Sequence, residues 1–230
     1  MDGTGDLFAP FVDALGPGAA VTVVRYPRDQ SLGYDALEAH ARAALPTRGP
    51  FVLLGESFSG PIAIRLAASQ PAGLAGLVLC CTFARNPWPA FSALSPLVGL
   101  LPMAHTPMAV LGPALLGRDS SPPLRSALRA AMAQVSSASL RARLRAILSM
   151  DASLLLRDTR LPTLDLRGAR DRLVPASAAR LVRLLRPDAQ VVDIDGPHGL
   201  LQTRPHEAAR AIGAFMHGLR MDGGAGAESP

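Results

Sequence analysis

The chain has 230 residues, 49% of them hydrophobic, which is enough for one domain with a fully buried core. All 23 basic residues are arginine, and the formal net charge is +5. The arginines are dispersed and no aromatic residues alternate with them, which favours solvated helix faces and disfavours nucleic-acid binding. No apolar run reaches the length of a membrane span and no secretory leader opens the sequence, so we expect a cytoplasmic protein.

Cys80 and Cys81 are the only cysteines, and they are adjacent in an apolar run. Neighbouring side chains on a strand point to opposite faces, so a disulfide between the two is not expected. Buried thiols in a reducing compartment fit this arrangement. No cysteine or histidine has the spacing of a metal ligand, so the sequence predicts neither a metal site nor a cofactor.

Helical and strand patterns alternate through most of the chain. In the first part, the predicted elements are a helix at 7–15, a strand at 21–24, a helix at 37–45, a strand at 51–54, a helix at 60–69 and a strand at 74–83. In the last part, they are strands at 163–166 and 190–194, a helix at 177–186 and a final helix that ends at 219. This alternation predicts an α/β fold with a mostly parallel sheet and helices on both faces.

The alternation stops between residues 84 and 158. The first half of this segment is rich in Pro and Leu, and its second half has helical spacing. We interpret it as a helical insertion into a single domain over residues 1–219 rather than as a domain of its own. The remaining residues, 220–230, are small and polar, and we expect a disordered tail.

A serine at the end of the apolar run 51–54 is the first candidate for catalysis. The order of Gly55, Ser57, Ser59 and Gly60 predicts a strand, a very tight turn and a helix. Such a turn holds the serine hydroxyl above the end of the sheet. A serine needs a base to remove its proton, and the base needs an acid to orient it.

His198 is the best candidate for the base, because it lies in a loop directly after the strand at 190–194 and has glycines on both sides. The other histidines, which lie in helical patterns, at a helix start or in the insertion, are His40, His217, His206 and His105. For the acid, Asp171 follows the strand at 163–166, at the sheet edge where α/β sites assemble. Asp195 is the main rival, but it is only three residues from His198; Asp165 and Asp193 lie within strands.

These three segments, in the order serine, acid and histidine, resemble the α/β-hydrolase family, esterases and acyltransferases included. The resemblance covers residues 1–219, and the insertion at 84–158 stands where the family carries a helical lid. It implies that Ser57 attacks an acyl carbonyl, that His198 acts as base and then as acid, and that Asp171 orients the imidazole. It also implies an oxyanion hole made by the backbone N–H groups of Phe58 and Met1.

The sequence departs from the family pattern in two places. Ser59 stands where the family has its second glycine, which moves here to Gly60. The strand that the family places between residues 21–24 and 51–54, and two earlier strands, do not occur. We therefore expect either a start upstream of Met1 or a truncated gene.

The resemblance implies a serine hydrolase that cleaves a carboxylic ester or thioester of a small molecule, without a cofactor. The apolar insertion favours an acyl or other hydrophobic substrate. Two alternatives stay open: an acyltransferase that uses the same acyl-enzyme, which the loop at Asp2–Gly5 favours, and a non-catalytic hydrolase-fold protein, which the missing strand favours. The sequence gives no oligomeric state.

Overall fold

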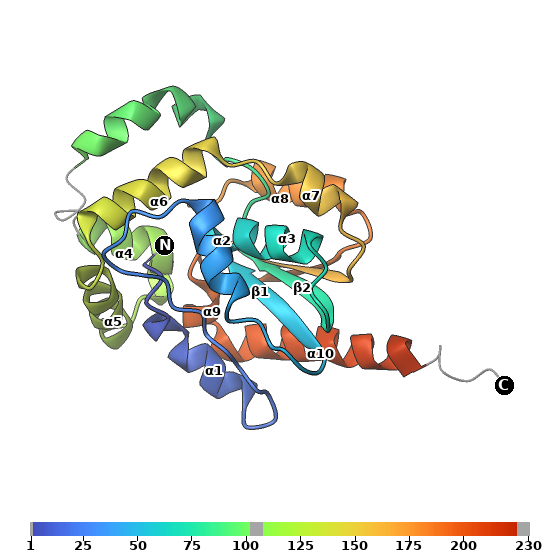
Figure 1. Cartoon of the computed structure of the whole chain (residues 1–230). Coiled ribbons are helices and arrows are strands. Elements are labelled where there is room, and N and C mark those ends of the chain that lie inside the picture. Colours follow the sequence, from blue (N-terminus) through green and yellow to red (C-terminus); the bar gives the residue numbers. More distant parts are fainter. Residues whose placement is uncertain (1, 102–107, 225–230) are drawn as a thin grey trace.

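The computed structural model describes residues 2–101 and 108–224 (Figure 1). Within these residues, a single parallel sheet contains β1 (Phe51–Glu56), β2 (Leu74–Cys80), β3 (Thr163–Gly168) and β4 (Gln190–Ile194), in that order. Each strand pairs in parallel with the next strand of the chain. The carboxyl ends of all four strands therefore meet at one edge, and the predicted α/β class is confirmed.

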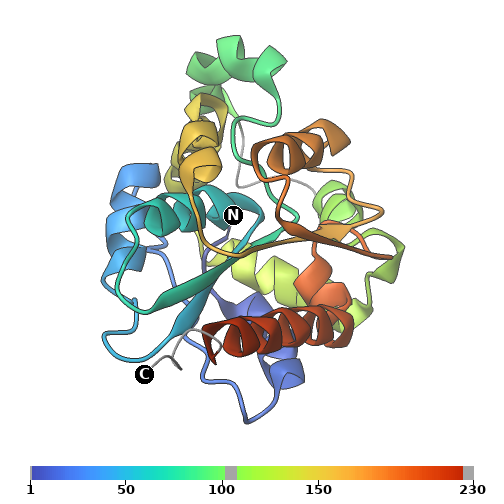
Figure 2. The same cartoon turned by 90° about the vertical axis from the view of Figure 1, so that its right-hand side faces the viewer.

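Helices cover both faces of this sheet (Figures 1 and 2). The helices outside the insertion are η1 (Asp6–Phe8), α1 (Ala9–Leu15), α2 (Tyr34–Arg42), η2 (Ser57–Ser59), α3 (Gly60–Ala68), α8 (Ala176–Leu185), α9 (Leu200–Thr203) and α10 (Pro205–Gly224). One apolar cluster joins α2, α3 and α8 to one face of the sheet, and a second cluster joins α1, α9 and α10 to the other.

The run of consecutive apolar residues on β2 follows from this layered arrangement. Leu77 and Leu79 pack into the cluster with α3, whereas Val78 and Cys80 pack into the cluster with α10. All four are fully buried. A central strand of a parallel sheet that is covered on both faces needs apolar side chains in both directions, so a continuous rather than an alternating pattern results.

Most of the described part of the insertion is helical. It contains η3 (Pro89–Leu100), α4 (Met108–Leu116), η5 (Gly117–Asp119), α5 (Pro122–Ala133), α6 (Ser137–Ser149) and α7 (Ser153–Asp158). Backbone hydrogen bonds join its two ends, from Ala152 N to Ala84 O and from Asn86 N to Met150 O, both at 2.7 Å. The last helix, α7, packs against α3 and α8, and its Leu156 is fully buried in the main core.

The predicted strand at 21–24 is wrong. These residues form no ladder with any described strand, and β1 is an edge strand on the side that faces them. A cavity of about 490 Å³ lies between the two, lined by Val21 to Val24 on one wall and Phe51 to Leu54 on the other. A strand requires a hydrogen-bonded neighbour, and the part of the chain that the structure describes places none beside these residues.

Helix α10 begins at Pro205 and ends at Gly224, so it runs past residue 220, where the tail was expected to begin. Residues 225–230 lie outside the described residues. Across the ranges 2–101 and 108–224, no helix is both long and apolar enough to cross a membrane.

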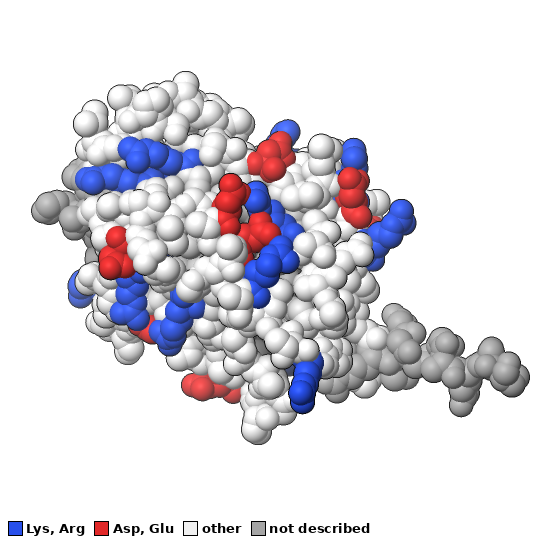
Figure 3. Space-filling view, viewed as in Figure 1, with Lys and Arg blue, Asp and Glu red and all other residues white. Residues whose placement is uncertain are grey.

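Charged side chains of both signs intermingle on the face shown in Figure 3. As an example of such pairing, Glu38 on α2 accepts hydrogen bonds from Arg42 at 2.7 Å and from Arg65 at 2.6 Å. Such pairing neutralises the arginines locally, and it agrees with the interpretation of the arginines as solvated helix faces.

Candidate active site

The turn after β1 places Ser57 at the carboxyl edge of the sheet. Ser57 has a φ of 53°, in the left-handed region that a residue with a side chain rarely adopts. The turn is tight because β1 and α3 almost touch behind it: a Cβ on Gly55 would lie 2.7 Å from the Cα of Gly60. The strained backbone turns the Ser57 side chain away from this contact and toward the loops that follow β3 and β4.

The position of the turn that has no room for a side chain is 60 rather than 59. A Cβ on Gly60 would lie 2.0 Å from Oγ1 of Thr82, whereas the chain accommodates a full serine side chain at Ser59. The Thr82 hydroxyl also donates a 2.5 Å hydrogen bond to the carbonyl oxygen of Ser57. Thr82, which follows β2, therefore explains why the second glycine stands at position 60.

His198 lies directly beside the serine. Its Nε2 is 2.7 Å from Oγ of Ser57, and its Nδ1 is 2.8 Å from Oδ2 of Asp171. The histidine side chain is 5% exposed and the Asp171 side chain 9%. The structure thus brings together all three side chains that the sequence analysis selected, from three separate loops at one edge of the sheet.

The acid loop holds Asp171 by backbone contacts of its own. The second carboxylate oxygen, Oδ1, accepts hydrogen bonds from Leu173 N at 2.8 Å and from Val174 N at 3.0 Å. These bonds leave Oδ2 for the imidazole. Because a carboxylate that faces Nδ1 keeps the proton there, Nε2 is left with its lone pair toward the Ser57 hydroxyl.

Comparisons with known proteins identify the family to which the chain belongs. A family model described as "Alpha/beta hydrolase family" matches residues 3–211. The chain belongs to the alpha/beta hydrolase family. It is also similar to a pimeloyl-[acyl-carrier protein] methyl ester esterase from Aromatoleum aromaticum, with 31% identity over 221 residues that cover 88% of this chain and 85% of that protein. The protein is thus a hydrolase.

Solved structures of hydrolases share its fold. A thermophilic esterase from Thermogutta terrifontis superimposes with a TM-score of 0.80 at 21% identity, covering 94% of this chain and 86% of that one. The enol-lactonase from Burkholderia xenovorans gives a TM-score of 0.77 at 17% identity, covering 94% and 88%. At this level of identity, the likeness concerns the fold alone.

Of the two residues expected to form the oxyanion hole, Phe58 lies within the described residues. Phe58 is buried in η2, and its carbonyl oxygen accepts a hydrogen bond from the Tyr34 hydroxyl at 3.1 Å. Met1 lies outside the described residues. The adjacent loop is held from the insertion: buried Arg143 on α6 donates to Asp2 O at 2.7 Å, and Tyr26 N donates to Gly3 O at 2.8 Å.

Glu56, the last residue of β1, is a second carboxyl close to the histidine. It accepts hydrogen bonds from Gln202 at 3.0 Å and from Leu201 N at 3.4 Å, both in α9, which starts two residues after His198. Burial raises the pKa of Glu56, while the hydrogen bond from Gln202 and the nearby His198 lower it. Glu56 therefore connects β1 to α9, the helix that follows the histidine loop.

The other candidate residues lie elsewhere. His40, His206 and His217 are exposed, and His105 lies outside the described residues. Asp195 is 80% exposed and pairs with Arg170 at 2.6 Å instead of with the imidazole. Glu56 and Arg143 escaped the sequence analysis. Glu56 directly precedes Ser57 in the serine motif, and this position could have indicated it. Nothing in the spacing of α6 distinguishes Arg143 from the other arginines of that helix.

Proposed function

We propose that this hydrolase cleaves a carboxylic ester or thioester through an acyl-enzyme on Ser57. The observation that carries the proposal is the unbroken line of hydrogen bonds from Ser57 Oγ through His198 to Asp171, at 2.7 and 2.8 Å. Both distances are in the range for proton transfer between positioned groups. The exposed Asp195 offers no comparable line.

In the first half of the reaction, Oγ of Ser57 attacks the acyl carbon as His198 Nε2 removes the hydroxyl proton. Asp171 stabilises the imidazolium that forms and does not itself take up the proton. The negative charge on the carbonyl oxygen is stabilised by the backbone N–H of Phe58 and by an N–H of the loop that Arg143 holds. Each donor of this kind contributes about 10²–10³ in rate.

The intermediate then collapses and the bond to the leaving group breaks. The leaving alkoxide or thiolate takes the proton from His198 and departs as an alcohol or thiol. In the second half, His198 removes a proton from water, the resulting hydroxide attacks the acyl-serine, and Ser57 recovers its proton as the carboxylic acid leaves. The overall change is ester and water to acid and alcohol.

The insertion and the esterase relative support an acyl chain as the substrate. Several large apolar side chains on η3, or immediately before it, are more than a third exposed; they include Trp88, Phe91, Leu94, Leu97 and Leu100. The relative from Aromatoleum aromaticum is by name an esterase for the methyl ester of a pimeloyl chain on acyl carrier protein. A methyl ester of an acyl chain is therefore the first substrate to test.

A fluorophosphonate probe tests the nucleophile. The wild-type chain should be labelled, Ser57→Ala should not, and Ser59→Ala, a change of the same kind two residues further along, should be labelled like the wild type. Ser57→Ala should also lower kcat by about 10⁴–10⁶. A well-folded wild-type chain that stays unlabelled would leave only the non-catalytic alternative.

The substrate is tested with two sets of esters. p-Nitrophenyl esters of graded chain length report the preferred acyl length, and methyl pimelate and pimeloyl methyl ester on acyl carrier protein report whether a carrier is needed. Running the same reactions with an added alcohol separates hydrolysis from acyl transfer, because a transferase yields a new ester in place of the acid.

A further inference from the structure

A short segment of the insertion lies directly on the histidine loop. The N–H of Gly199 donates a 2.7 Å hydrogen bond to the carbonyl oxygen of Leu115, at the end of α4. Gly117 has a φ of 56°, and a Cβ there would lie 3.0 Å from the Cβ of Pro197. Leu116 is buried at this contact. The insertion therefore touches both residues that flank His198 in the chain.

Asp119 ends this segment, and its carboxylate binds two arginines at once. Oδ2 accepts from Arg170 at 2.7 Å and Oδ1 accepts from Arg204 at 2.8 Å. Arg170 immediately precedes Asp171, and Arg204 immediately follows α9, the short helix after His198. A single side chain of the insertion thus joins the acid loop to the end of the histidine loop.

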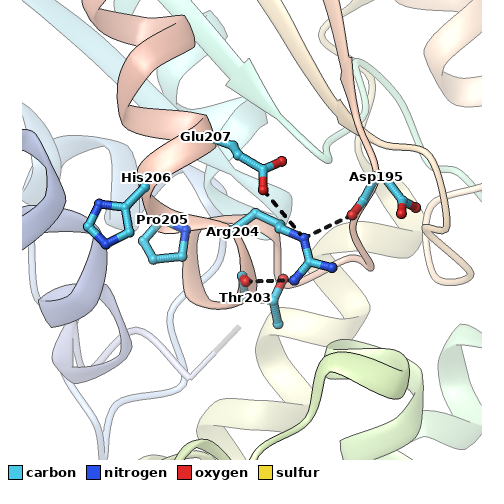
Figure 4. A pocket seen from close by; sticks show the side chains of 6 residues that line it. All are labelled: Asp195, Thr203, Arg204, Pro205, His206 and Glu207. Atoms are coloured by element: carbon cyan, nitrogen blue, oxygen red, sulfur yellow. Dashed lines mark hydrogen bonds and ion pairs between the residues drawn. The ribbon is translucent and has the colours of Figure 1, made fainter.

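The two arginines are also held by the body of the protein. Arg170 donates to the Asp195 carboxylate at 2.6 Å and to its carbonyl oxygen at 3.0 Å. Arg204 donates to the Asp195 carbonyl oxygen at 3.0 Å and lies 3.8 Å from Glu207 (Figure 4). Each guanidinium is therefore held at Asp195, in the loop that follows β4, and Asp119 adds the connection from the insertion.

The backbone strengthens the link between the two loops. Ala169 N donates to Ile194 O at 2.8 Å, and Arg170 N donates to Gly196 O at 2.9 Å. The acid loop and the histidine loop are thus paired along their backbones up to the residues that precede Asp171 and His198. Asp119 adds a charged contact between the insertion and these two loops, through Arg170 before Asp171 and Arg204 after α9.

An isolated ion pair at the surface contributes little, about 0–1 kcal/mol. Asp119 differs from that case because its side chain is only 19% exposed and because its carboxylate binds two guanidinium groups. Arg170 also pairs with Asp195 and Arg204 with Glu207, so each guanidinium keeps a carboxylate when Asp119 is replaced. The replacement removes the charged contact between the insertion and the two loops whose backbones set the distances around His198.

We propose that Asp119 is a positioning residue that transmits the placement of the insertion to the histidine and the acid. The insertion then influences catalysis by holding the loops that carry Asp171 and His198 at their reactive spacing, as well as by any contact with substrate. This inference rests on the proposed roles of those two residues.

The variants are Asp119→Asn, which keeps the shape and removes the charge, and Asp119→Glu, which keeps the charge. Asp158→Asn is the matched control, because Asp158 is an exposed carboxylate of the same insertion that pairs with Arg157 at 2.8 Å. A displacement of about 1 Å in an active site costs up to about 10² in rate. We expect Asp119→Asn to lower kcat and the rate of fluorophosphonate labelling about tenfold or more, to leave KM for a short p-nitrophenyl ester unchanged, and to be largely rescued by Asp119→Glu.

A spectroscopic readout separates this inference from the proposed function. The Nδ1 proton of His198, held against Asp171, gives a downfield proton NMR signal that does not depend on turnover and persists in Ser57→Ala. Asp119→Asn should broaden or shift this signal, whereas Asp158→Asn should not. An unchanged signal with unchanged kcat in a folded Asp119→Asn variant overturns the inference. A wild-type chain that shows the signal but no labelling of Ser57 overturns the proposed function instead.

Discussion

Asp165 is a buried carboxyl whose ionisation is opposed by its surroundings. It lies on β3 between Leu79 and Val191, it is 3% exposed, and its Oδ2 has no hydrogen-bond partner among the described residues. Burial raises its pKa from the usual 3.8 to about 6, although Arg167 and Arg183 act in the opposite direction. The folded protein therefore holds a proton that the unfolded chain releases.

This proton makes the stability depend on pH with a defined sign. Below about pH 4, Asp165 is protonated in both states and costs nothing. As the pH rises through the window from 3.8 to about 6, only the unfolded chain ionises, so the free energy of unfolding falls. Since one pKa unit corresponds to about 1.4 kcal/mol, the loss is about 1 kcal/mol at pH 4.5 and about 3 kcal/mol at pH 7.5.

Asp165→Asn removes the ionisation and keeps the shape. We subtract the free energy of unfolding of the wild type from that of the variant. We expect this difference to be about 2 kcal/mol larger at pH 7.5 than at pH 4.5, because only the wild type loses stability as the pH rises. This difference between the two pH values is independent of any constant cost of burying the amide. Urea unfolding followed by circular dichroism at both values measures it. Asp29→Asn, a change at an exposed carboxyl, is the control. An equal effect of Asp165→Asn at both pH values would refute the reasoning.

Three further substitutions test the site. Gly60→Ala brings a Cβ to 2.0 Å from Thr82 Oγ1, and overpacking of this kind should cost about 1–3 kcal/mol of stability in thermal unfolding. Asp171→Asn leaves Nδ1 without its acceptor and should lower kcat about 10⁴-fold in an ester assay. Arg143→Ala leaves the buried carbonyl of Asp2 without this donor and should cost about 1–3 kcal/mol in urea unfolding.

Each of these variants has a control in which the same kind of substitution is made at an exposed or open position. Gly213→Ala in α10 meets nothing within 4 Å and should be neutral or stabilising. Asp193→Asn, at an exposed carboxyl near the end of β4, should leave kcat near the wild-type value, and Arg145→Ala, at an exposed arginine of α6, should leave stability unchanged. A control that matches its test variant would contradict the corresponding role.

The order of elements and the catalytic candidates could be predicted because each depends on local sequence. The apolar runs of β1, β2, β3 and β4 are short and bounded, so their existence was readable even where their ends were not. Ser57, Asp171 and His198 each follow a strand directly, and parallel strands bring their carboxyl ends to one edge. The place of each residue in the chain therefore implied its place in the fold.

The failures concern interactions between distant parts of the chain. The residues at 21–24 have the composition of a strand, but strand formation requires a neighbour, and none of the described strands pairs with them. A cavity lies between these residues and β1 instead. The role of Arg143 depends on the carbonyl of Asp2, 141 residues away. No periodicity in α6 records such a contact.

By itself, the sequence determined the α/β class, the helical insertion and the three side chains at the carboxyl edge of the sheet, because secondary structure and strand order are encoded in local patterns. Only the tertiary structure decided that Thr82 leaves no room for a side chain at position 60, that Glu56 connects β1 to α9, and that Asp119 contacts two loops at once. These outcomes depend on the distance between side chains from different elements, which packing of the whole chain sets.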